Sequence, residues 1–309
     1  MLYNNLGGYL KNKYGKRLKK ICVDGGFSCP NRDGTVGTGG CIYCSERGSG
    51  EHICGGVSIK EQVERGLLGA SCDDGFIVYF QNFTNTYASV EILRERYDAA
   101  LIDGRIKILA IGTRPDCINE EIAELIASYK DKVDVWVELG LQTASDKTAR
   151  IINRGYESSV YTRACEMLKE YKIDTVTHLM IGLPGESDDE LRETVALVNS
   201  VNPFGVKIHS VYVAEGTLLA QMYRSGKYTP IEKDTYVERA VYVLTHIHEE
   251  TVVHRITGDC PKNMLVAPEW NSDKNSVIAE INARMKALTF KQGCLYSPTC
   301  SHNKPDECK

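Results

Sequence analysis

The chain has 309 residues, enough for one α/β barrel or for about two smaller domains. Hydrophobic residues make up 42% and charged residues 25% of the sequence, which excludes disordered and fibrous proteins. The 37 Lys and Arg residues against 41 Asp and Glu residues give a net charge of -4, so any contact with nucleic acid or anionic lipid must be local. No apolar run approaches the length of a membrane span and no signal-like core opens the chain, so we expect a cytoplasmic protein with no membrane partner.

Short apolar, β-branched runs alternate along the chain with segments of helical periodicity, which is typical of β/α units around a parallel sheet. In chain order, strands are predicted at residues 19–23, 76–80, 106–111, 133–139, 175–181 and 206–213. Helices are predicted at 58–68, 90–102, 119–129, 161–171, 188–200, 233–249 and 273–288, several of them after a Ser, Asp or Asn N-cap. Six units in this order predict an α/β fold, a partial (β/α)6 TIM-like barrel.

The sequence pattern changes near Arg224, where we place a domain boundary. Residues 1–224 are predicted to form the barrel core with a basic N-terminal segment. Residues 225–292 are predicted to form a small α/β C-terminal extension with a possible strand at 252–256, and residues 293–309 a mobile, cysteine-containing tail. We expect the extension to close the open side of the barrel and to bring His254, Arg255 and Trp270 near the substrate.

In parallel β/α folds the chemistry takes place at the carboxyl ends of the strands. Five predicted strands end in polar or glycine-rich turns, so we predict one site along this rim of the barrel. The turns are the cysteine-containing loop after the first strand and residues 81–86, 113–116, 138–142 and 182–186 after the next four.

The chain has 12 cysteines, and in a reducing compartment such a number points to metal binding or catalysis. Cys29, Cys41 and Cys44 follow the first strand with the spacing C-x11-C-x2-C. One interpretation is a structural zinc site, with His52 or Cys54 as the fourth ligand. The other is an iron-sulfur cluster held by three thiolates, which leaves one iron free to bind and activate a ligand.

The remaining cysteines are given other roles. Cys22, Cys72, Cys117 and Cys165 stand beside apolar residues and are expected to pack as small hydrophobic side chains. A second metal site in the tail is an alternative for Cys294, Cys300 and Cys308 with His302, although their spacing lacks a C-x2-C pair.

The cysteine loop and the later turns together resemble the YhcC/YtqA group of radical S-adenosylmethionine (SAM) proteins, which includes the tRNA-modifying enzyme MnmL. The group is related to the catalytic subunit of the elongator complex. The resemblance covers about residues 3–270, with the motifs in order. After the cysteine loop they are Tyr79-Phe80-Gln81-Asn82, Asn85-Thr86-Tyr87, Thr113-Arg114-Pro115-Asp116-Cys117, Glu138-Leu139-Gly140-Leu141-Gln142, Asn153-Arg154-Gly155, Gly182-Leu183-Pro184-Gly185-Glu186 and His254-Arg255-Ile256-Thr257-Gly258.

The resemblance implies that Cys29, Cys41 and Cys44 hold a [4Fe-4S] cluster whose open iron binds the amino and carboxylate groups of SAM. One electron, from a donor such as flavodoxin or ferredoxin, then cleaves SAM into methionine and a 5′-deoxyadenosyl radical. Gln142 and Arg154 match SAM-binding residues of related enzymes. Arg154 is suited to bidentate binding of the SAM carboxylate, and Gln142 to the ribose hydroxyls.

Other SAM contacts are also implied by the resemblance. His178 stands where a related enzyme has a ribose-binding Asp. The turn after the second strand is expected to receive the SAM amino group, through Gln81, Thr84 or Asn85. Gly182 permits close backbone approach to a cofactor, and a plain strand-to-helix turn is the alternative for it.

The resemblance further implies a tRNA substrate whose wobble uridine carries a 5-carboxymethylaminomethyl group that is trimmed to 5-aminomethyl. Hydrogen abstraction from the carboxymethyl carbon followed by C–N cleavage is a mechanism for this change. Three alternatives remain: a radical SAM enzyme acting on another RNA or a small molecule, a zinc module, and an iron-sulfur electron carrier.

The first twenty residues contain six Lys and Arg and no acidic residue, interleaved with Tyr3, Tyr9 and Tyr14. Cations that neutralise phosphates and aromatic rings that stack on bases are the parts of an RNA-binding surface. A solvated amphipathic face is the alternative. Glu138 follows a strand, and two interpretations of it are equally open: an acid-base or SAM-contacting group, or a carboxylate that pairs with Arg114 or Arg154 at the rim.

Overall fold

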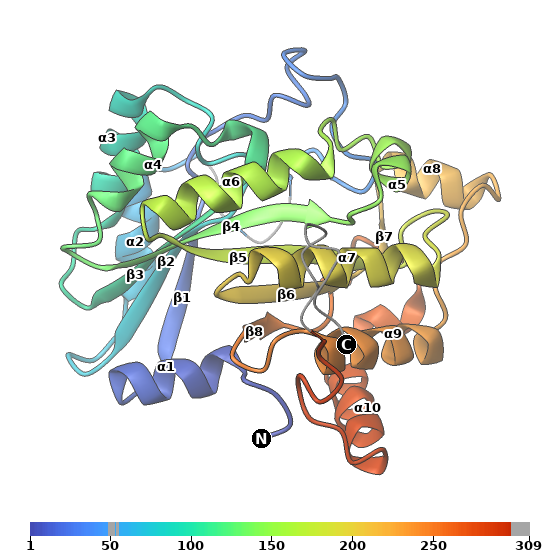
Figure 1. Cartoon of the computed structure of the whole chain (residues 1–309). Helices are drawn as coiled ribbons and strands as arrows, with labels where there is room; N and C mark the ends of the chain where they lie inside the picture. Colours follow the sequence, from blue (N-terminus) through green and yellow to red (C-terminus); the bar gives the residue numbers. More distant parts are fainter. Residues whose placement is uncertain (49–52, 54–55, 298–309) are drawn as a thin grey trace, which may run out of the picture.

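In the computed structural model of the chain, residues 1–48, 53 and 56–297 are described, and they form one curved parallel sheet flanked by helices (Figure 1). Seven strands form this sheet in the order β1-β2-β3-β4-β5-β6-β8, and every neighbouring pair is parallel. The strands are β1 Leu18–Val23, β2 Gly75–Phe80, β3 Ile106–Thr113, β4 Asp134–Gln142, β5 Asp174–Ile181, β6 Gly205–Ser210 and β8 Val252–Arg255. The edge strands β1 and β8 do not pair with each other, so this is a half-barrel, open between them.

Helices connect the strands. They are α1 Leu6–Tyr14, α2 Ile59–Leu67, α3 Val90–Ala100, α4 Glu120–Ala127, α5 Asp146–Ile151, α6 Ser158–Glu170, α7 Asp188–Val201, α8 Leu218–Arg224, α9 Lys233–His246 and α10 Lys274–Ala287. Two short strands, β7 Val213–Ala214 and β9 Leu265–Ala267, form a separate antiparallel pair.

Side-chain caps fix several helix starts at the predicted positions. Ser58 and Asn119 accept hydrogen bonds from the backbone N–H groups of Glu61 and Ile122. Ser187 forms a full capping box with Glu190, in which each side chain accepts from the other residue's backbone N–H. Because such caps satisfy N–H groups that have no partner inside the helix, the polar residues before the helical periodicity mark the helix ends well.

The two faces of the sheet carry separate cores. The outer face packs under α2, α3, α4, α6, α7 and α9 through alternate strand residues such as Val78 and Leu109. The inner face has a smaller core that includes Ile108, Trp136 and, from α1, Leu10. These strand residues lie near the amino ends of their strands, so α1 covers that end of the half-barrel and leaves the other end open for a site.

The fold prediction is confirmed, with two additions. The predicted region 252–256 is a seventh parallel strand, β8, which extends the same sheet beyond β6. The basic N-terminal segment contributes α1, which the periodicity did not reveal. The residues after Arg224 thus add to the sheet of the core, and the domain division placed there stays a prediction.

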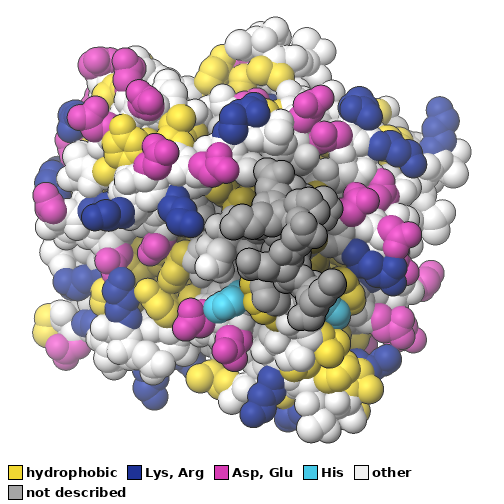
Figure 2. Space-filling view, in the orientation of Figure 1, with side chains coloured by type: hydrophobic (Ala, Val, Ile, Leu, Met, Phe, Trp, Pro, Cys, Tyr) yellow, Lys and Arg dark blue, Asp and Glu magenta, His cyan; other side chains and the backbone are white. Residues whose placement is uncertain are grey.

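Charged side chains of both signs are interspersed over the face of the molecule that Figure 2 shows, as the small net charge leads one to expect. None of the helices in the described ranges has the length and apolar composition needed to cross a lipid bilayer.

Candidate active site

A cavity of about 830 Å³ lies inside the half-barrel, between the strands and the cysteine loop. Seven of the ten residues predicted for the site line it, namely Cys29, Cys41, Cys44, Gln81, Thr84, Gln142 and His178. Asn85, Arg154 and Gly182 are not among the lining residues. Most of the residues predicted for this rim therefore line the same cavity.

The cysteine loop is held to the turn that follows α5. The Asn31 side-chain amide donates to the carbonyl of Asn153 at 2.5 Å, and the Asn153 amide donates back to the carbonyl of Gly40 at 2.7 Å. Ile42, which follows Cys41 in the loop, is buried and donates its backbone N–H to the carbonyl of Ile152. Only glycine suits position 155, because φ there is +85° and a Cβ atom would lie 3.1 Å from the Asn31 side-chain oxygen.

The three loop thiols are free and half-buried. A hydrogen bond with Cys44 lowers the pKa of the Cys41 thiol to about 6 against the effect of burial, and the charge of Arg114 lowers it further. The same hydrogen bond, together with burial, raises the pKa of the Cys44 thiol well above its usual value. The Asn31 amide also lies 3.8 Å from the Cys41 sulfur. A thiol that ionises readily is suited to metal ligation, because the thiolate is the form that binds metals.

Within the described residues, no three His, Cys, Asp or Glu side chains converge closely enough to hold a single metal ion. Each thiolate of a [4Fe-4S] cluster binds a different iron atom, so such a cluster needs three thiolates around one space rather than around one point. Cys29, Cys41 and Cys44 all line one cavity, and a cluster held by the three stays a prediction. His52 and Cys54, the candidates for a fourth zinc ligand, lie outside the described residues.

Gln142 stands at the carboxyl end of β4 in a left-handed conformation, with φ at 61°. The register between β4 and β5 shifts just before it. Gly140 leaves room for its side chain, since a Cβ atom there would lie 2.4 Å from the Gln142 amide nitrogen. A non-glycine residue held in this conformation is typical of a functional position.

Two residues of the turn after β2 have different roles. The Thr84 hydroxyl is buried at the cavity wall without a hydrogen-bond partner in the described part of the chain, so it is available to a ligand. Asn85 instead donates its amide to the carbonyls of Phe80 and Gly112, at 3.1 and 2.7 Å, and so joins the ends of β2 and β3. Asn85 thus supports the turn; its side-chain oxygen is buried without a hydrogen-bond partner among the described residues, and its contact with SAM stays a prediction.

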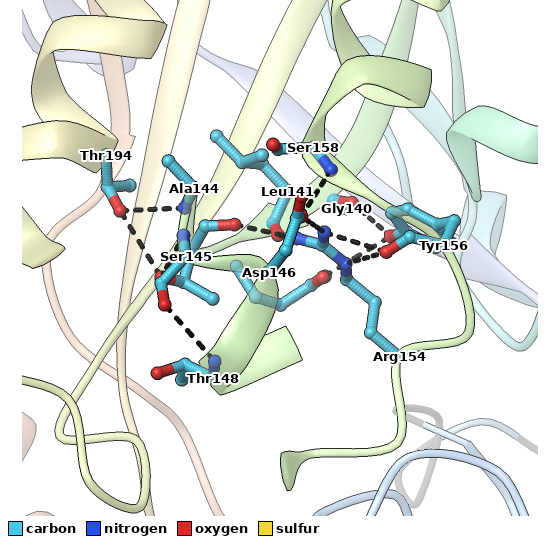
Figure 3. A network of polar contacts seen from close by, with 12 residues as sticks. Gly140, Leu141, Ala144, Ser145, Asp146, Thr148, Arg154, Tyr156, Ser158 and Thr194 are labelled. Atoms are coloured by element: carbon cyan, nitrogen blue, oxygen red, sulfur yellow. Dashed lines mark hydrogen bonds and ion pairs between the residues drawn. The ribbon is translucent and has the colours of Figure 1, made fainter. Parts of the chain in front are cut away.

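Arg154 is 1% exposed, and Figure 3 shows its guanidinium enclosed by the turn after β4. It donates to the carbonyls of Leu141 and Thr143 at 2.6 and 2.7 Å, to Tyr156 O, and to the Asp146 carboxylate at 3.3 Å. All three guanidinium nitrogens thus have protein acceptors. This differs from the predicted bidentate contact with a cofactor carboxylate, because the arginine is fully used in fixing the turn that presents Gln142.

Gly182 lies beside a separate cavity of about 260 Å³, away from the cysteines. Its N–H donates to the Glu186 carboxylate at 3.3 Å, and its carbonyl accepts from the Tyr228 hydroxyl at 2.8 Å. These contacts fit the alternative of a strand-to-helix turn. Burial raises the pKa of Glu186 to about 8.

One wall of the main cavity carries charged and titratable residues, of which Glu138, His178 and Arg255 were singled out from the sequence but Lys207 and His209 were not. We call Lys20, Glu138, His178, Lys207, His209 and Arg255 the inner charged layer; all six line the cavity. Strand pairing places His178 opposite Lys207 and Lys207 opposite Arg255, so three neighbouring strands bring these side chains to one level.

Glu138 is the centre of this layer. Its carboxylate forms an ion pair with Lys207 and a hydrogen bond with His178 at 3.0 Å, and its side chain has no exposed surface. The expected pairing with Arg114 or Arg154 is wrong, because Glu138 points into the barrel and Arg114 pairs with Asp116 at 2.6 Å.

The buried charges shift one another's pKa values. Burial would raise the pKa of Glu138, but Lys207 and His178 hold it well below its usual value. Burial lowers the pKa of Lys207 to about 7 against the attraction of Glu138, and it also lowers the pKa of His178. Such shifts in a cavity are typical of functional sites. One signal was present in the sequence, since Lys207 and His209 alternate with apolar residues in a strand that is otherwise buried.

Several side chains of the basic N-terminal segment form contacts within the protein, which leaves fewer of them free to bind RNA. Lys13 and Tyr14 both contact the Asp134 carboxylate, and Lys19 pairs with Asp74 at 2.9 Å. Tyr9 packs edge-on against Phe204. The three tyrosines Tyr3, Tyr9 and Tyr14 are half-buried, whereas Lys11 and Arg17 are exposed.

The other cysteines differ in how far they are buried. Cys165 is buried, as expected, but Cys72 is exposed because it lies in a surface turn before β2. Cys22 and Cys117 are half-buried, and Cys22 lines the cavity beside Lys20. Cys294 is exposed, while Cys300, Cys308 and His302 lie outside the described residues.

Comparisons with known proteins agree with this geometry. The Radical SAM superfamily model matches residues 33–198, and the Radical_SAM C-terminal domain model matches residues 203–287. The chain is 35% identical to YtqA of Bacillus subtilis over 94% of this chain and 92% of that protein. It is 35% identical to YhcC of Escherichia coli over 91% of each.

More distant proteins share part of the chain or its fold. The tRNA uridine(34) acetyltransferase of Dehalococcoides mccartyi is 30% identical over 57% of this chain and 38% of that protein. Among solved structures, the archaeal Methanocaldococcus infernus Elp3 has a TM-score of 0.64 over 76% of this chain and 59% of that chain, at 21% identity. That likeness shows a shared fold.

Proposed function

The chain belongs to the radical SAM superfamily, and from this we infer that it cleaves SAM at a [4Fe-4S] cluster held by Cys29, Cys41 and Cys44. The observation that carries this inference is the shared cavity, which is lined by three free thiols and by polar groups at the strand ends. When bound, the cluster supplies the electron that splits SAM into methionine and a 5′-deoxyadenosyl radical.

The residues of the chain have distinct tasks in this proposal. Asn31 donates toward the Cys41 sulfur, which favours the ionised ligand. The buried Thr84 hydroxyl accepts from the SAM ammonium, and the Gln142 amide reaches the ribose hydroxyls. Arg154 acts indirectly, because it fixes the turn that carries Gln142.

Anaerobic reconstitution with iron and sulfide, followed by dithionite and SAM, tests the cofactor chemistry. We expect 5′-deoxyadenosine from the wild type and none from Cys29→Ala, Cys41→Ala or Cys44→Ala. Cys72→Ala is the matched control, because that exposed thiol lies outside the cavity lining. Tight zinc binding without iron or sulfide would instead support a structural zinc module.

For the substrate, we propose the wobble uridine of tRNA, on which a 5-carboxymethylaminomethyl group is trimmed to 5-aminomethyl. The proposal is supported by the resemblance to the MnmL group and by the 30% identity to a tRNA uridine(34) acetyltransferase over 57% of this chain. Nucleosides of tRNA from cells with and without the gene test it. In cells without the gene we expect 5-aminomethyluridine to be lost and 5-carboxymethylaminomethyluridine to accumulate. Identical nucleosides in the two strains would contradict the proposal.

The proposed electron source is a small redox protein such as flavodoxin or ferredoxin. Either carrier, kept reduced by its reductase, should replace dithionite in the 5′-deoxyadenosine assay. If the product forms with dithionite but with neither reduced carrier, this class of donor is rejected.

A further inference from the structure

The inner charged layer is a second polar surface of the cavity, and His178 is the one member of it that the family resemblance predicted to contact SAM. Lys207 and Arg255 face each other in the pairing of β6 with β8, and Lys20 lies on the other edge strand, β1. Because the half-barrel is open between β1 and β8, Lys20 and Arg255 flank its open side. A molecule that enters there meets Lys207 next.

This layer holds more positive than negative charge. Three cations, Lys20, Lys207 and Arg255, stand against one carboxylate, that of Glu138, which forms an ion pair with Lys207. Lys20 and Arg255 are exposed, and neither forms a hydrogen bond or ion pair with another side chain in the described part of the chain. The ammonium groups of Lys20 and Lys207 both contact the ring of Tyr79, at 4.9 and 4.4 Å from its centroid. Cations gathered in this way, with one anion among them, favour a negatively charged ligand.

An unused polar atom points to a ligand as well. His209 lines the cavity, and its Nε2 atom is buried without a hydrogen-bond partner among the described residues. Its ring lies 5.1 Å from that of His178, which is itself engaged by Glu138. A buried polar nitrogen without a partner is costly, unless a bound group satisfies it.

The cysteine loop and the inner charged layer occupy different parts of the cavity wall. Cys29, Cys41 and Cys44 lie on the loop after β1. His178, Lys207 and Arg255 lie in register on the strands β5, β6 and β8. Since the amino-acid part of SAM belongs on the cluster, the inner charged layer remains for the substrate.

We propose that the inner charged layer is a carboxylate-binding subsite for the substrate, in which Lys207 and Arg255 hold the acidic group. The proposal rests on the proposed function, because the layer lies in the cavity assigned to SAM cleavage. A guanidinium binds a carboxylate in bidentate fashion, and an ammonium adds a point charge beside it. The phosphates of an RNA lie on its backbone, whereas a substituent on an extruded base can reach between the strands.

The test measures anaerobic binding to the reconstituted protein with SAM present, by calorimetry. The probes are the nucleoside 5-carboxymethylaminomethyluridine and its carboxamide analogue, which differ in the charge of one group. We expect the wild type to bind the carboxylate about tenfold more tightly, and Arg255→Gln to lose this preference while binding the carboxamide unchanged. Lys19→Met is the matched control, since Lys19 lines the same cavity but already pairs with Asp74.

Lys207 needs a compensated variant, because Lys207→Met alone leaves Glu138 buried without its partner. The double variant Glu138→Gln/Lys207→Met removes both charges and should also lose the preference. Equal wild-type affinities for the two probes, or an Arg255→Gln variant that keeps the preference, would overturn the subsite. Equally strong displacement by inorganic phosphate would assign the layer to a phosphate and would also overturn it.

Failure of the proposed function gives a different result. If tRNA nucleosides are unchanged by the enzyme but the carboxylate preference exists and depends on Arg255, the tRNA proposal fails and the subsite stands. If tRNA is converted while both probes bind equally, the function stands and the subsite fails.

Discussion

The cysteine loop and the inner charged layer face the same cavity, but they are held in place by different means. The loop depends on side-chain contacts to the backbone, such as those of Asn31 and Asn153, and on a glycine at position 155. The layer depends on strand pairing, which sets His178, Lys207 and Arg255 at one level of the sheet. A proposed cofactor site on a loop is therefore combined with a proposed substrate wall on the strands.

The difference teaches which changes should damage which part. Changes at the loop and its supporting turn should affect the cofactor, because few contacts fix its geometry. Changes in the layer should affect charge balance and substrate discrimination, because the sheet keeps its geometry.

The largest expected effect is at Arg154, which fixes the turn that presents Gln142 to the cavity. Arg154→Met leaves the carbonyls of Leu141 and Thr143 without donors in a buried turn, and we expect a loss of about 4 kcal/mol in the free energy of unfolding. Denaturant unfolding measures it, with the exposed Arg150→Met as control. A stable Arg154→Met protein that has lost only SAM affinity would return Arg154 to the role of a cofactor contact.

A somewhat smaller effect is expected in the layer. Glu138→Gln leaves the Lys207 ammonium buried without its counter-charge, which should cost about 3 kcal/mol in the free energy of unfolding. Adding Lys207→Met should bring the stability back to within about 1 kcal/mol of the wild type. If the double variant is as unstable as the single one, the ion pair is not what organises this wall.

A pH effect is expected outside both regions, at Glu186. Its pKa is raised by burial to about 8 in the folded protein, so the unfolded chain loses this proton at lower pH and stability falls as the pH rises toward 8. Glu186→Gln removes this dependence, and the variant should gain about 1–2 kcal/mol relative to the wild type between pH 6 and pH 8. Thermal unfolding at the two pH values measures it, and parallel curves for both proteins would contradict it.

The smallest effect concerns RNA. Charge reversal of the exposed Lys11 and Arg17 should weaken tRNA binding and lower the slope of its salt dependence by about 2. Binding at several salt concentrations measures the slope, with reversal of Lys262 and Lys286, which are exposed and lie outside the basic segment, as control. An unchanged slope would leave the basic segment as a solvated face.

Much of the fold could be predicted from the sequence, because hydrophobic periodicity and N-caps such as Ser187 report local structure directly. The spacing of the three thiols indicated a metal site but left zinc and an iron-sulfur cluster open, and the resemblance to a family favoured the cluster. The pairing of Glu138 was not, since it depends on Lys207 two strands away in the sheet, and strand register brings them together only in the folded protein. The role of Arg154 in supporting the turn could not be predicted either. It donates mainly to backbone carbonyls, which every residue has, so no particular residue type in the sequence indicates these contacts.

The central claim is that the cofactor and the substrate use separate parts of one cavity. SAM cleavage without substrate, measured as 5′-deoxyadenosine formed by reconstituted Cys41→Ala and Arg255→Gln side by side, tests it most directly. We predict no product from Cys41→Ala and wild-type amounts from Arg255→Gln. Loss of the product in both variants would show that the inner charged layer serves SAM, and would contradict the separation.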